Sequence, residues 1–148
     1  MKKTDASAKL TLFANRAVAV IVVVLLFTLP MLLDWYCGFR ALTRLERTAL
    51  TAAFYACAGV IGLALWHMDR LLLSILAGQV FTKANVRRIS HIRWCCGAVA
   101  LICIPAAACY YPLIFLVLIM GFLFLAVSVV CRVMSAAVEL QEENDLTV

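Results

Sequence analysis

The chain has 148 residues, of which 66% are apolar and 14% charged, and its formal net charge is +5. A soluble domain would be roughly 45–50% apolar and about 25% charged, so the composition excludes a water-soluble globular domain and favours lipid as the solvent. One domain is expected at this length, with no room for a separate soluble catalytic domain, and the positive charge points to membrane orientation rather than direct nucleic-acid binding.

Four apolar runs predict four transmembrane helices, at residues 17–33, 49–66, 94–110 and 113–133. About 20 residues of helix cross the hydrocarbon core of a bilayer, and each run is close to that length. We therefore predict an all-α, polytopic membrane protein in which residues 1–148 form two transmembrane hairpins joined by a helical connector. Trp35, Trp66 and Trp94 fall at predicted span ends, where tryptophan is a common interface anchor.

Three local features of the spans carry expectations of their own. Pro30 is expected to bend or end the first span, and residues 34–48 are expected to form a loop with a short amphipathic helix. Gly59 and Gly62 lie three residues apart in the second span, which suggests a face for close helix packing. Pro105 is expected to kink the third span.

The connector, residues 67–93, separates the two hairpins and is basic. Its first part keeps helix-forming residues, so the second span is expected to continue past Asp69 and to stop at Gly78. Thr82 is expected to cap a new helix, because its hydroxyl can accept from an early backbone N–H. From there Val86, Ile89 and Ile92 form an apolar stripe that leads into the third span.

Orientation follows from the positive-inside rule. Ten of the thirteen lysines and arginines lie in the N-terminal segment, the connector and the exit of the fourth span, and the other three lie in the loop after the first span. The rule places both termini, the connector and the tail (residues 134–148) in the cytoplasm. We therefore expect a multi-pass protein of a bacterial inner membrane.

No catalytic or metal-binding constellation is visible. The seven cysteines are odd in number, lack a Cys-x-x-Cys spacing and mostly sit in apolar runs, so neither a disulfide framework nor a zinc site is expected. His67 and His91 are far apart in the sequence and are interpreted as interface or packing residues. The spans hold no ionisable Asp, Glu, Lys or Arg near their middle, which disfavours an ion-coupled carrier. We expect no cofactor and no enzyme.

The connector and the tail carry opposite charges on the same predicted side. Lys83, Arg87, Arg88 and Arg93 are in the connector, and the tail carries Glu139, Glu142, Glu143 and Asp145. Two interpretations stay open: the segments dock on each other and present a face to a protein partner, or they are solvated separately, with the basic segment against anionic lipid.

Two short stretches resemble a bacterial family of small four-span membrane proteins with a domain of unknown function. They are residues 81–89 (FTKANVRRI) and 140–148 (LQEENDLTV). That family pairs a Phe-Thr-x-Glu-Asn-Val-Arg-Arg-Leu connector with a Glu-Asn-Asp-Leu-Thr-Val tail, and Ala84 stands here in place of the family's Glu. Members are often encoded beside a small helix-turn-helix transcription regulator, so the resemblance implies a membrane partner or antagonist of such a regulator.

The sequence therefore predicts a binding and regulatory role. The candidate partner-binding residues are Lys83, Asn85, Arg87, Arg88, Glu142, Glu143 and Asp145. The expected partners are the lipid bilayer and a cytoplasmic helix-turn-helix regulator, and a homo-oligomer is left open. The alternative is a small membrane transporter, or a membrane protein of immunity or stress response.

Overall fold

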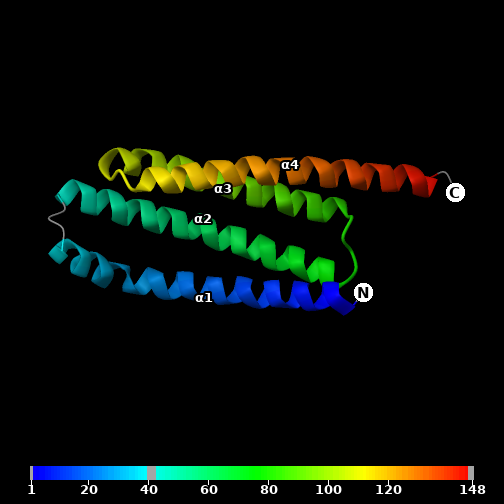
Figure 1. Ribbon diagram of the computed structural model, residues 1–148, viewed down its shortest axis with the longest axis horizontal. Coiled ribbons are helices and arrows are strands. Elements are labelled where there is room, and N and C mark those ends of the chain that lie inside the picture. The colour runs from blue at the N-terminus through cyan, green and yellow to red at the C-terminus, as the bar shows by residue number, and fades with distance from the viewer. Residues whose placement is uncertain (1, 40–42, 147–148) are drawn as a thin grey trace.

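The structure is a computed structural model that describes the backbone of residues 2–39 and 43–146 and the side chains of residues 9–36, 38 and 43–144. Its four helices are α1 (Lys2–Phe39), α2 (Arg44–Leu76), α3 (Lys83–Cys109) and α4 (Leu113–Leu146), and the described residues contain no strand. The helices run alternately up and down beside one another (Figure 1). The prediction of an all-α, four-span architecture with two hairpins is confirmed.

Each helix is long and apolar enough to cross a membrane. The shortest, α3, has 27 residues, which corresponds to about 40 Å at 1.5 Å per residue. The helices extend well beyond the predicted spans: residues 2–16 and most of the tail continue α1 and α4 instead of forming separate segments. Pro30 lies within α1 and does not end it, and Pro105 likewise lies within α3.

The helix ends have local causes in the sequence. α2 begins with a capping box in which the Thr43 hydroxyl accepts from Glu46 N–H and the Glu46 carboxylate accepts from Thr43 N–H. Residues 44–48, predicted to lie in the loop after the first span, are therefore the start of α2. At its other end Gly78 has φ 78°, a conformation that favours glycine and lets the chain leave the helix. Thr82 caps α3 as predicted.

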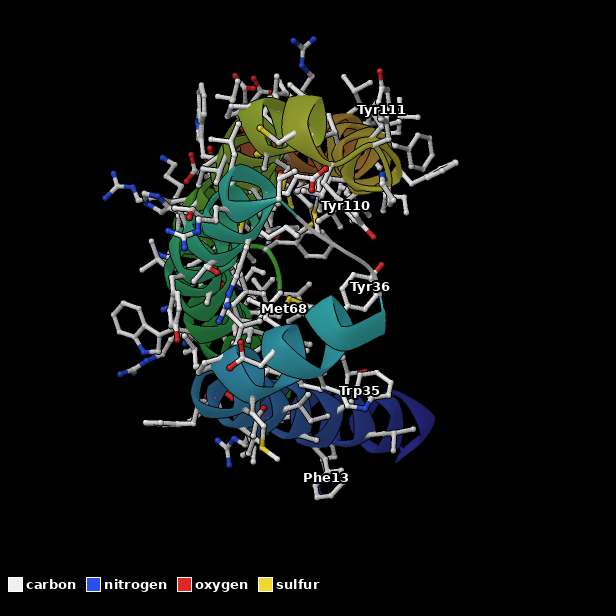
Figure 2. The ribbon with its side chains drawn as sticks, turned by 90° about the vertical axis from the view of Figure 1, so that its left-hand side faces the viewer. Phe13, Trp35, Tyr36, Met68, Tyr110 and Tyr111 are labelled. Carbon is white, nitrogen blue, oxygen red and sulfur yellow. The ribbon has the colours of Figure 1, made fainter. Side chains whose placement is uncertain are left out.

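The helices pack in chain order, α1 on α2, α2 on α3 and α3 on α4, and no other pair of helix backbones comes into contact in the described part of the chain. Viewed from the end that carries Tyr36 and Tyr110, the four helices form an arc that is open on one side (Figure 2). The hydroxyl groups of Tyr36 and Tyr110 bond across that opening at 2.6 Å. Figure 2 also shows Phe13 pointing away from the other helices, as expected for a side chain in contact with lipid.

Among the described residues, two buried clusters join α2, α3 and α4. One contains Cys57, Val99 and Cys103 and lies in the middle of the spans. The other contains Leu71, Ile89 and Cys131, with Val86 and Ile92 packed against it, which confirms the apolar stripe predicted for the start of α3. The glycines behave differently from the prediction: nothing lies within 4 Å of a Cβ built on Gly59 or Gly62, whereas Gly97 contacts the Phe124 ring of α4.

The Cys57 and Cys103 sulfur atoms, which lie 3.7 Å apart between α2 and α3, allow a direct test of this packing. Both side chains are buried thiols. We expect a membrane-permeant oxidant to join them within one chain, because side-chain rotation is enough to close the bond. Mass spectrometry of alkylated peptides should find this pair, and the Cys57→Ser variant should lose it. Cross-links that join Cys57 to Cys95 or Cys131 instead would contradict the packing of α2 on α3.

Candidate functional site

Most of the charged groups gather at one end of the bundle, which we call the connector end. It comprises the start of α1, the α2–α3 connector and the last turns of α4, and both termini lie there (Figure 1). Within it a groove of about 610 Å³ opens between α2 and α3. We call this the basic groove, and it is lined by Trp66, His67, Arg70, Lys83, Ala84, Arg87, Arg88 and His91.

Asn85 organises the connector from within. Its side chain is fully buried (0% exposed), and Nδ2 donates to the carbonyl oxygens of Gln79 and Val80 at 2.6 and 3.1 Å. Its backbone N–H donates to the Thr82 hydroxyl, which caps α3. These bonds give partners to carbonyl groups of the loop between α2 and α3, which lies outside both helices. Asn85, predicted to bind a partner, therefore shapes the connector and is not itself on the surface.

Arg88 carries this arrangement across to α2. Its Nη1 donates to Asn85 Oδ1 and to the backbone carbonyl of Arg70, both at 3.1 Å. The guanidinium of Arg70 lies 5.9 Å from the centre of the Trp66 ring. These contacts hold two of the groove's cations in place, since a bonded guanidinium loses much of its freedom.

The lining of the groove includes a histidine pair that sequence reasoning missed. The rings of His67 and His91 stack with centroids 4.9 Å apart and planes 11° apart. The sequence does contain a signal for this pair. Each histidine lies twelve residues from Gln79, so an antiparallel helical hairpin whose turn is centred on Gln79 places the two histidines opposite each other.

An ion pair joins the connector to the tail. Lys83 Nζ lies 2.9 Å from Glu142 Oε1, and both side chains are largely exposed (77% and 52%). Arg93, predicted to belong to the same basic surface, instead lies over the Trp94 ring. Glu143 is exposed on α4, and the side chain of Asp145 lies outside the described residues. An exposed pair contributes about 0–1 kcal/mol, so this contact positions the tail without locking it.

Arg87 is available for binding. It is exposed on the rim of the basic groove and has no side-chain partner within the described part of the chain. Of the two interpretations that the sequence left open, the Lys83–Glu142 pair fits the docking of the connector on the tail. Arg88 and Asn85 support this surface from within, while Arg87, Lys83 and Glu142 form it.

The start of α1 is tied to the same end. Arg16 Nε lies 3.1 Å from Asp69 Oδ1, and Asn15 Nδ2 donates to the Leu65 carbonyl at 3.1 Å. At the opposite end Arg47 pairs with Asp34. The connector end is therefore assembled from all four helices.

The membrane region offers different chemistry. A cavity of about 280 Å³ opens beside Cys57 and Cys103, and its lining is apolar. Among the described residues no three His, Cys, Asp or Glu side chains lie close enough to hold a metal ion together. The polar chemistry of the described residues is thus concentrated at the two ends of the bundle, with its larger share at the connector end.

The fold and this distribution of charge define a four-helix protein of the membrane-spanning class, with one elaborated polar end. The chain belongs to the DUF2975 family of proteins of unknown function, which it matches over residues 3–148. No curated protein and no solved structure matches it.

Proposed function

We propose that this membrane protein binds a small cytoplasmic helix-turn-helix transcription regulator at the connector end and thereby acts as its antagonist. The observation that carries the proposal is the Lys83–Glu142 ion pair. It brings the connector and the last turns of α4 into one surface of mixed charge. A regulator held on this surface at the membrane is kept away from its DNA.

Two further features support a binding role over an enzymatic one. The interior of the connector end is ordered, because hydrogen bonds from Asn85 and Arg88 fix the connector against α2. Its surface offers cations and carboxylates side by side, and a partner with the complementary pattern would be recognised by charge. The family resemblance supplies the class of partner, since its members often accompany such regulators.

The proposal includes an orientation. The connector end carries ten of the thirteen lysines and arginines, so the positive-inside rule assigns it to the cytoplasm of a bacterial inner membrane. A cytoplasmic regulator then reaches the connector, the start of α1 and the end of α4 from one side.

Copurification with the regulator encoded beside this protein tests the proposal. Arg87→Glu reverses an exposed charge that has no partner among the described residues, so we expect it to weaken capture in mild detergent by roughly tenfold or more through like-charge repulsion. Arg44→Glu makes the same change at the opposite end of the bundle and should leave capture unchanged. A regulator that is not captured by the unaltered protein, or captured equally by both variants, would contradict the proposal.

A further inference from the structure

The basic groove has the chemistry of an anion site. The groove is lined by four cationic side chains, those of Arg70, Lys83, Arg87 and Arg88. In the described part of the chain, Glu142 forms an ion pair with one of them, Lys83. Cations gathered in this way repel one another, and a bound anion relieves that repulsion. The histidine pair adds N–H groups that can donate to the same anion.

The groove is also preorganised. Arg88 is held by Asn85 and by the Arg70 carbonyl, and Arg70 is held over Trp66. Both guanidinium groups are thus positioned before a ligand arrives. Guanidinium groups match the geometry of phosphate oxygens, to which they donate two parallel N–H bonds. A phosphate group therefore fits this set better than a single carboxylate.

The position of the groove relative to the membrane surface points to a phospholipid as the source of the phosphate. Leu63, Trp66 and Arg70 follow one another along one face of α2 at helical spacing, from the membrane region toward the connector end. Leu63 is 49% and Trp66 56% exposed, so both present apolar surface outward. The order aliphatic, aromatic, cationic matches a phospholipid, with its chains in the hydrocarbon, its glycerol at the aromatic belt and its phosphate beyond.

We propose that the basic groove binds the phosphate group of an anionic phospholipid, with Arg70 and Arg87 as its main ligands and Arg88 and the two histidines behind them. This site does not rest on the regulator proposed above. It assigns a role to the stacked histidines and to Arg70, which the partner surface does not use. The bound lipid would link α2 to α3 at the membrane surface.

The test uses the purified full-length protein in detergent, without any partner. Native mass spectrometry should show retained phosphatidylglycerol but little phosphatidylcholine, and phosphatidylglycerol should raise the melting temperature. Arg70→Gln with Arg87→Gln should weaken this retention by roughly tenfold or more, since each basic residue contributes about 1 kcal/mol near an anionic surface. Arg44→Gln with Arg47→Gln removes the same formal charge at the opposite end of the bundle and should change it little.

A second arm separates the two sources of phosphate. Stabilisation by inorganic phosphate that is lost in the Arg70/Arg87 double variant would show that the groove takes the phosphate group even without lipid chains. Arg87→Gln alone alters an exposed side chain without a partner among the described residues, so its effect on retention is free of folding defects. Equal retention of phosphatidylglycerol and phosphatidylcholine, or an equal loss in the control double variant, would overturn the proposal.

Discussion

Replacing Asn85 with leucine is expected to destabilise the protein by about 2–4 kcal/mol, because three hydrogen bonds of a fully buried side chain, two to backbone carbonyls and one from a guanidinium, are lost together. Asn85 donates to the carbonyls of Gln79 and Val80 and accepts from Arg88, and its side chain is fully buried. Leucine has a similar size but cannot make any of these bonds. The apparent melting temperature in mild detergent should fall by roughly 5–10 °C.

The same variant should also loosen the connector locally. Trypsin cleaves after Arg87 and Arg88, and it should cut there faster once Arg88 is no longer held by Asn85. Gln79→Ala is the matched control, because Gln79 is exposed and accepts from Asn85 through its backbone carbonyl. A leucine variant that melts and is cleaved like the control would show that Asn85 does not organise the connector.

Replacing Gly97 with valine is expected to destabilise the contact between α3 and α4 by about 1–3 kcal/mol. A Cβ at Gly97 would lie 3.2 Å from Cδ2 and 3.3 Å from Cε2 of Phe124, and valine adds two more carbons beyond it. The Phe124 ring cannot easily turn away, because it also packs edge-on against Trp94. A lower melting temperature of the detergent-solubilised variant measures the effect.

Gly59 supplies the control for that substitution. It also lies within a span, but nothing approaches within 4 Å of a Cβ built there. Gly59→Val should therefore leave the melting temperature unchanged or raise it slightly, since glycine is a poor helix former. If Gly59→Val proves as harmful as Gly97→Val, the helices pack through faces other than those described.

Local signals in the sequence predicted a large part of this fold. Apolar run length located the four helices, Gly78 marked the end of α2, and Thr82 marked the start of α3. Each of these depends on a few neighbouring residues and on the thickness of a bilayer. Helix extent was underestimated because hydrophobicity ends where the hydrocarbon ends, whereas backbone hydrogen bonding continues into α1 and α4 beyond it.

Features that depend on helix rotation were not predictable in the same way. Gly59 and Gly62 have the composition of a packing face, yet the glycine that meets a neighbouring helix is Gly97. Which face of a helix meets its neighbour is set by the register of the whole hairpin. The stacking of the two histidines and the burial of Asn85 also follow from that register. The sequence therefore identified residues of the connector end but did not predict how they are arranged.

The placement of the connector end in the cytoplasm is the claim on which binding of a cytoplasmic regulator depends most directly. A reporter fused after Val148, at the end of the chain that follows α4, tests it in intact bacterial cells. The account predicts fluorescence from a green fluorescent protein fusion and no activity from an alkaline phosphatase fusion at the same position. An active alkaline phosphatase fusion together with a non-fluorescent green fluorescent protein fusion would place the connector end outside the cytoplasm and contradict this orientation.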